Sequence, residues 1–153
     1  MKNKRFKTII FGIGNEGRED DGLGWLFLDK VKKSLPDNFD IEYRYQLQVE
    51  DAEISRHYDR VIFIDAHIKK FDKGFIWKIC PSKPSDAYTS HELNAETIMY
   101  FCQTIYNKTP QAYILGISGK SYELSIGLTD IASRNLENAI RFFENKILNL
   151  VNQ

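Results

Sequence analysis

The sequence has little of what secreted, membrane-anchored or nucleic-acid-binding proteins need. It has two cysteines, Cys80 and Cys102, which lie far apart and form no C-x-x-C pair. A disulfide framework or a thiol-rich metal site is therefore excluded, and we expect free thiols. The 21 basic residues are balanced by 21 acidic ones. That balance argues against a nucleic-acid partner, which needs a basic surface, and against a polybasic membrane anchor.

Long apolar runs are missing too. The first one, at residues 8–11, is too short for a signal-peptide core of about seven residues or more. No stretch approaches the roughly 18 apolar residues of a membrane span. We therefore expect a cytoplasmic protein without a membrane partner. With 153 residues, 42% of them hydrophobic, the chain has enough apolar material for one domain spanning 1–153.

Short apolar runs alternate with helical patterns along the chain. Strands are predicted at residues 7–12, 41–47, 60–66, 74–80 and 112–117. Helices are predicted at 21–34, at 94–107 and from 129 to about 150, with a shorter helix or turn at 50–57. Asp20 or Asp21 can cap the first of these helices. The alternation predicts a three-layer α/β/α fold, with about five mostly parallel strands and helices on both faces.

A glycine-rich turn follows the first predicted strand. Gly12, Gly14 and Gly17 match the G-x-G-x-x-G pattern of dinucleotide-binding proteins. The same turn carries four acidic side chains, at Glu16, Glu19, Asp20 and Asp21. Carboxylates at a helix N-terminus repel a pyrophosphate, so nucleotide binding is disfavoured. The first three of these acids have a structural interpretation, in which they cap the helix and offset its dipole.

Further polar positions lie where the loops of such a fold should converge. Asp65 follows a buried apolar run, and His91 lies in a polar loop that leads into the next predicted helix. Function in doubly wound sheets sits beyond the carboxyl ends of the strands. Asp21, Asp65 and His91 are therefore the candidate catalytic and metal-binding residues. Two carboxylates and one imidazole suit a divalent cation such as Ni²⁺ or Zn²⁺. His67, two residues after Asp65, is the replacement candidate.

Other hydrolytic machinery is missing from the sequence. There is no H-E-x-x-H zinc-peptidase motif and no G-x-S-x-G nucleophile motif. Neither cysteine is paired with a histidine and an orienting group, so a cysteine nucleophile is disfavoured. His57 is interpreted as structural or exposed.

Together these residues resemble the hydrogenase maturation proteases, endopeptidases that trim the C-terminal extension of the large subunit of nickel-iron hydrogenases. The most specific match is G-x-G-N-x-x-x-x-D-D-G-x-G at 12–24. The Ile-Asp-Ala run at 64–66 and the Ser-His pair at 90–91 follow in the right order. The pairs at 116–117 and 128–129 resemble the family's last strand and the start of its final helix. The resemblance spans nearly the whole chain.

The resemblance implies that Asp21, Asp65 and His91 are nickel ligands. It also implies that the Ni²⁺ belongs to the substrate, the large-subunit precursor, which already holds it before cleavage; other divalent metals can occupy the site. The reaction would be amide hydrolysis through a metal-bound water or a metal-polarised carbonyl, with a carboxylate as general base. The implied partner is the precursor, with no nucleic acid and no membrane.

Two segments depart from the family pattern. Residues 45–50 read Tyr-Gln-Leu-Gln-Val-Glu where a Gly-Thr pair is common, which resembles the branch associated with cytoplasmic bidirectional or NAD-coupled hydrogenases. Residues 73–74 are Lys-Gly where Pro-Gly is common. Two alternatives stay open. One is a binding module that recognises a nickel-loaded partner or a nucleotide without cutting it. The other is a different metal-assisted hydrolase on the same scaffold.

Overall fold

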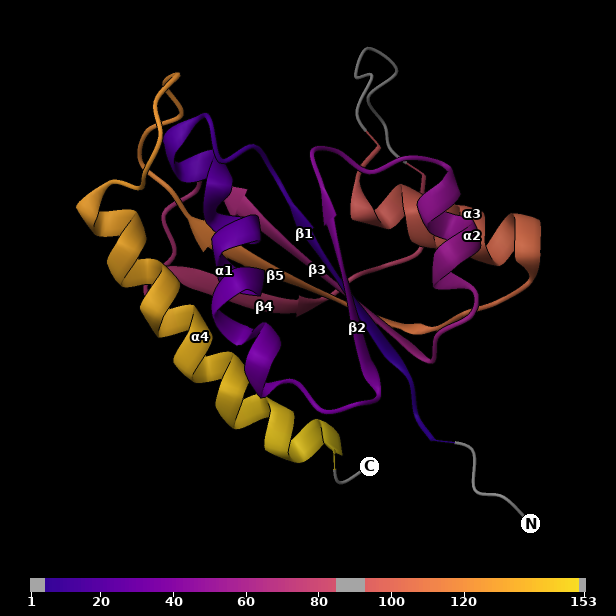
Figure 1. Cartoon of the computed structure of the whole chain (residues 1–153). Helices are drawn as coiled ribbons and strands as arrows, with labels where there is room; N and C mark the ends of the chain where they lie inside the picture. Colours follow the sequence, from indigo (N-terminus) through magenta and orange to yellow (C-terminus); the bar gives the residue numbers. More distant parts are fainter. Residues whose placement is uncertain (1–4, 85–92, 152–153) are drawn as a thin grey trace.

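The structure is a computed structural model and describes residues 5–84 and 93–151. At its centre is a five-stranded sheet with the strand order β2-β1-β3-β5-β4 (Figure 1). The strands are β1 (Thr8–Ile13), β2 (Phe39–Arg44), β3 (Arg60–His67), β4 (Phe75–Ile79) and β5 (Gln111–Ser118). All neighbouring strands pair in parallel except β4, which runs antiparallel to β5 at one edge. The predicted, mostly parallel sheet is confirmed.

Helices cover both faces of this sheet (Figure 1). The helices are α1 (Leu23–Val31), α2 (Glu50–Ser55), α3 (Ala95–Tyr106) and α4 (Asp130–Val151), with 3-10 turns η1 (Glu19–Gly22) and η2 (Lys32–Ser34) on either side of α1. α1 and α4 contact each other on one face, and α2 and α3 contact each other on the other. The predicted three-layer α/β/α fold is therefore confirmed. Among the described residues, no helix combines the length and the apolar character that crossing a membrane requires.

The central strands are continuous apolar runs because both of their faces are covered. In β3, Ile62 and Ile64 belong to the core beneath α1 and α4, whereas Val61 and Phe63 belong to the core beneath α2 and α3. All four are essentially inaccessible to solvent. Alternate residues of a strand share a face, so Asp65 continues the series that points toward α2 and α3.

The strand predicted at 41–47 ends earlier, at Arg44. The Arg44 carbonyl oxygen accepts a hydrogen bond from the Gly14 N–H, just after β1, at 2.9 Å. It also accepts one from the Trp25 indole N–H, at 2.9 Å. Beyond Arg44 the chain turns toward α2. These hydrogen bonds are tertiary contacts, so the alternation of residue types along the strand cannot predict them.

The helix predicted at 94–107 is present as α3, and its sequence accounts for both of its ends. Asn94 caps the N-terminus by accepting a hydrogen bond from the Thr97 N–H at 2.8 Å. Asn107 ends the helix in the left-handed conformation, with φ at 55°. Ile105, which the periodicity assigns to the apolar face, is 56% exposed instead.

α1 lies so close to the sheet that only glycine fits at position 24. A Cβ on Gly24 would stand 2.5 Å from the Ile13 carbonyl oxygen and 2.7 Å from the Ile64 carbonyl oxygen. Both oxygens belong to the backbone of central strands, so displacing them would cost considerable free energy.

We expect Gly24→Ala to lower the free energy of unfolding by about 2 kcal/mol in total. Overpacking against backbone atoms costs about 3 kcal/mol, the upper end of the usual range, and alanine regains roughly 1 kcal/mol over glycine inside a helix. A chemical denaturation curve measures it. Gly17→Ala is the control, because a Cβ there meets only the Asn15 side chain, at 3.2 Å. An unchanged midpoint for Gly24→Ala would contradict the close approach.

Candidate functional site

A cavity of about 620 Å³ opens at the carboxyl ends of β1 and β3. The chain passes from β1 to β2 on one side and then returns past β1 to β3, so the strand order reverses between β1 and β3. This is the topological switch point, where open α/β sheets place their ligands. The walls come from the turn after β1, the segment after β2, the end of β3 and the first turn of α3.

Asp21 and Asp65 line this same cavity. The Asp21 carboxylate accepts a hydrogen bond from the Asn15 N–H at 3.0 Å, which links η1 to the turn after β1. The Asp65 carboxylate accepts one from the Ala66 N–H at 2.8 Å. Both side chains are half-buried. Two carboxylates that face one cavity can bind a divalent cation or accept and return a proton.

Gly14 allows the turn that brings Asp21 to the cavity. Its φ of 143° lies in the region that favours glycine. A Cβ at this position would overlap the Asp21 carbonyl oxygen, which accepts a second hydrogen bond from the Asn15 N–H, at 3.0 Å. Gly14, one of the three glycines that match a nucleotide-binding pattern, therefore serves a tight backbone turn that positions a carboxylate.

Of the two histidines considered as ligands, His67 lines the cavity beside Asp65. Burial lowers the pKa of His67, and the positive charge of Lys78 lowers it further, so the ring is neutral at neutral pH. The neutral ring is the form that binds metals. His91 lies outside the described residues, and its role as a ligand stays a prediction. Within residues 5–84 and 93–151, no three His, Cys, Asp or Glu side chains lie close enough together to hold a metal ion.

The other reactive side chains lie away from the cavity lining. Cys80 and Cys102 are free and buried, as expected, and burial raises the pKa of Cys80 to about 12. A thiol in that state is a poor nucleophile. His57 is exposed, as expected, and its Nε2 lies 3.2 Å from a Glu53 carboxylate oxygen on α2.

Asp20 is fully buried and accepts four hydrogen bonds from the loop after β5. Its Oδ2 accepts from the Lys120 N–H at 2.6 Å, the Ser121 N–H at 2.9 Å and the Thr129 hydroxyl at 2.8 Å. Its Oδ1 accepts from the Thr129 N–H at 2.8 Å. Burial by itself would raise the pKa of Asp20, but these hydrogen bonds outweigh burial and lower the pKa below its ordinary value. The carboxylate is therefore charged and links this loop to the turn after β1.

The expectation that Asp20 or Asp21 caps the first helix is wrong. α1 begins after Gly22, and no side chain caps it. The carboxylate of Asp20 is used by the loop after β5. Glu19 also contacts this loop, because it accepts a hydrogen bond from the Ser121 hydroxyl at 3.0 Å. Asp20 has a structural role, as expected. Its hydrogen-bond partners, however, lie far away in the sequence and not within its own helix.

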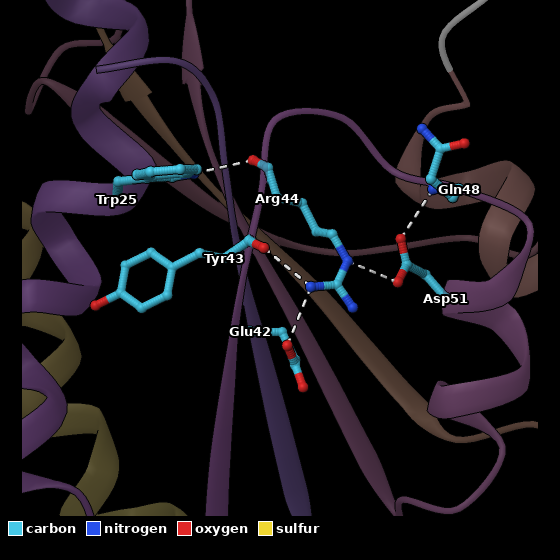
Figure 2. A network of polar contacts seen from close by, with 6 residues as sticks. All are labelled: Trp25, Glu42, Tyr43, Arg44, Gln48 and Asp51. Carbon is cyan, nitrogen blue, oxygen red and sulfur yellow. Dashed lines mark hydrogen bonds and ion pairs between the residues drawn. The ribbon is translucent and has the colours of Figure 1, made fainter. Parts of the chain in front are cut away.

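Arg44 directly precedes the cavity-lining residues after β2, and Figure 2 shows its polar contacts. Its guanidinium donates from Nε to the buried carboxylate of Asp51 and from a terminal nitrogen to Glu42, both at 3.0 Å. The other oxygen of Asp51 accepts a hydrogen bond from the Gln48 N–H at 2.8 Å. An arginine with two carboxylate partners keeps its charge compensated although it is largely withdrawn from water. The chain between β2 and α2 is thereby anchored at both of its ends.

The anchored segment, residues 45–50, is the one that departs from the family pattern. It places Gln46 and Leu47 in the cavity lining. Leu47 is buried, whereas Gln46 is exposed. The segment that departs from the pattern therefore forms part of the cavity wall.

The cavity lining also includes residues to which no motif points. Phe63 and Ile114 contribute apolar surface from β3 and β5, and Lys78 and Glu96 contribute charged groups from β4 and α3. These residues come from four elements far apart in the chain. Only the assembled sheet brings them to one place.

No protein-family model and no curated protein sequence matches the chain. The structure nevertheless superposes on solved structures over nearly its whole length. The hydrogenase maturating endopeptidase HybD from Escherichia coli matches with a TM-score of 0.78 at 18% identity, over 94% of this chain and 93% of that chain. The nickel-iron hydrogenase maturation protease HycI from Thermococcus kodakarensis matches with a TM-score of 0.73 at 21% identity, over 97% and 94%. This chain has the fold of the hydrogenase maturation endopeptidases.

An uncharacterised protein from Wolinella succinogenes shares the same fold, with a TM-score of 0.66 at 18% identity over 95% of this chain and 99% of that chain. At these identities the likeness establishes the fold. The resemblance in the sequence motifs is confirmed at that level, and Asp21 and Asp65 line the cavity of this chain.

We expect Asp20→Asn to lower the free energy of unfolding by about 3 kcal/mol at neutral pH, because an amide has one acceptor oxygen and leaves buried N–H donors unpaired. The lowered pKa fixes the sign of the pH dependence. The stability that Asp20 provides is complete above its unfolded-state pKa of about 4 and is lost as the pH falls through the lower folded-state pKa.

Melting temperatures of the wild type and Asp20→Asn, compared from neutral to strongly acidic pH, measure this effect. The gap between the two proteins should be widest at neutral pH and narrow in acid. The exposed Asp72 supplies the control variant, Asp72→Asn, which should track the wild type throughout. A neutral-pH melt of Asp20→Asn equal to that of the wild type would show that the four hydrogen bonds are not needed.

Proposed function

We propose that this protein is an endopeptidase of the cytoplasm that removes the C-terminal extension of the nickel-loaded large-subunit precursor of a nickel-iron hydrogenase. The observation that carries the proposal is the meeting of Asp21 and Asp65 in one cavity, at the switch point of a fold shared with solved maturation endopeptidases. The sequence motif around Asp21 supports the same function, because it is longer and more specific than a glycine turn alone.

The donor set of the cavity suits the nickel that such a precursor carries. Asp21 and Asp65 offer anionic oxygen atoms, and the imidazole of His91 or of His67 adds a neutral nitrogen. A divalent ion beside a peptide bond polarises the carbonyl group or acidifies a bound water. A carboxylate of the cavity, which can be one of these ligands, takes the proton of the attacking water and returns it to the leaving amine.

The direct test is incubation with a nickel-loaded precursor, followed by mass measurement of the product. We expect the extension to be removed from the loaded precursor and to stay on the nickel-free precursor. Cleavage of both forms would indicate a different hydrolase on this fold. Binding of the loaded form without cleavage would indicate a binding module.

Asp21→Asn should abolish cleavage of the loaded precursor while changing the free energy of unfolding by less than about 1 kcal/mol. Asparagine keeps the shape, and its amide oxygen still accepts the hydrogen bond from Asn15. An amide oxygen is, however, a much weaker ligand for a divalent cation than a carboxylate. Gel or mass analysis of the precursor, beside a thermal melt, measures both quantities.

Glu16→Gln is the matched control for this variant. It removes a negative charge from the same turn, but Glu16 is exposed and lies outside the cavity lining. The control should cleave at the normal rate. Normal cleavage by a well-folded Asp21→Asn would refute the role of Asp21. If Asp21→Asn loses its fold, Asp65→Asn is the variant that decides.

A further inference from the structure

The most exposed large apolar side chains in the described part of the chain gather at the cavity end of the sheet. They are Ile126, Ile68 and Leu124, which are 90%, 83% and 80% exposed. Ile68 directly follows β3 and lines the cavity. Leu124 and Ile126 lie in the loop between β5 and α4, and β5 runs parallel to β3 beside it. Both segments therefore leave the sheet at its carboxyl edge, where the cavity opens.

The loop between β5 and α4 is held in place by its main chain. Asp20 binds both of its ends, as described above. Between these ends, the Glu19 N–H donates to the Ser125 carbonyl oxygen at 2.8 Å, and the Ser125 N–H donates to the Gly17 carbonyl oxygen at 3.0 Å. Figure 1 shows the loop, in orange, beside the indigo turn before α1. The backbone of the loop is thus fixed to this turn at its ends and near its middle.

Leu124 and Ile126 flank the residue of the loop that pairs with this turn. Ser125 forms an isolated parallel bridge with Arg18. Alternate residues of an extended chain share a face, so the side chains of Leu124 and Ile126 point to the same side. A partner that covers this apolar pair gains free energy by removing it from water, and little conformational entropy is lost because the backbone is already fixed.

The turn that holds this loop also contributes to the cavity. Gly17 bonds to the loop, and Asp21, four residues later, lines the cavity. Four residues span at most about 14 Å, and the 3-10 turn η1 makes the separation shorter still. A standard protein interface buries about 800 Å² per partner, which is a patch roughly 30 Å across. A protein substrate that brings a peptide bond to Asp21 is therefore wide enough to cover the loop as well.

We propose that Leu124 and Ile126, with Ile68 at the cavity mouth, form a docking surface for apolar side chains of the large-subunit precursor. This inference rests on the function proposed above, whose substrate is a whole protein subunit. Aliphatic side chains offer no metal ligand, so docking on this surface requires no nickel, whereas cleavage does. A second copy of this chain is the less suitable occupant, because it would cover the cavity mouth at Ile68 and exclude the substrate.

The double variant Leu124→Ser/Ile126→Ser tests this surface. Both side chains are exposed, so we expect an unchanged melting temperature. For the nickel-loaded precursor we expect KM to rise about 10- to 100-fold, with kcat changed by less than about twofold. The dissociation constant for the nickel-free precursor, measured by surface plasmon resonance, should rise by a similar factor.

Ile105→Ser is the matched control. Ile105 is 56% exposed on α3, so this change also replaces an exposed aliphatic side chain with a hydroxyl group. Isoleucine and serine have similar helix propensities. Glu96 lines the cavity at the start of α3, and Ile105 lies nine residues later, about 14 Å further along the helix. We expect the KM and the affinity of the wild type.

Wild-type KM and wild-type affinity in the double variant would overturn the inference. So would a wild-type dimer, seen by size-exclusion chromatography, that becomes a monomer in the double variant without a change in KM, because the occupant would then be a second copy of this chain. A wild type that binds the precursor but does not cleave its loaded form would refute the proposed function alone, and the change in dissociation constant would still decide the docking surface. Binding of neither form would refute both.

Discussion

The carboxylate of Asp20 is the group on which the geometry of the site depends. Its four hydrogen bonds join the turn after β1 to residues 100 to 109 positions further along the chain. A buried charge without these donors would be strongly unfavourable, so the folded state requires the loop after β5 to be in place. Asp21 follows directly in the chain. The contact that stabilises the fold therefore also fixes the position of a cavity carboxylate.

Asp20 and Asp21 are adjacent residues of the same type, but their carboxylates make different contacts. Asp20 is fully buried, and the loop occupies all of its accepting capacity. Asp21 is half-buried, accepts hydrogen bonds from its own turn and faces the cavity. The Asp20 carboxylate is used within the fold, whereas the Asp21 carboxylate lines the cavity. Environment, rather than residue type, separates the two acids.

The features that the sequence predicts well are those that repeat locally or follow from chain order. The apolar run of β3 and the spacing and caps of α3 are local patterns. The meeting of Asp21 with Asp65 follows from a rule about parallel strands. The partners of Asp20 could not be predicted, because they lie about 100 residues away. The early end of β2 at Arg44 depends on contacts with Gly14 and Trp25, so a local sequence pattern cannot predict it either.

The distance in sequence between Asp20 and Thr129 has a consequence for how the protein is made. Thr129 supplies two of the four hydrogen bonds, yet it is synthesised 109 residues after the carboxylate that accepts them. Chains emerge from the ribosome N-terminal part first, and contacts that close long loops form late because their entropic cost is high. A nascent chain can contain both Asp21 and Asp65 and still lack the loop that fixes their surroundings. The contacts of Asp20 are therefore completed only when the last helix begins, so an unfinished chain carries Asp21 on a turn that is not yet fixed.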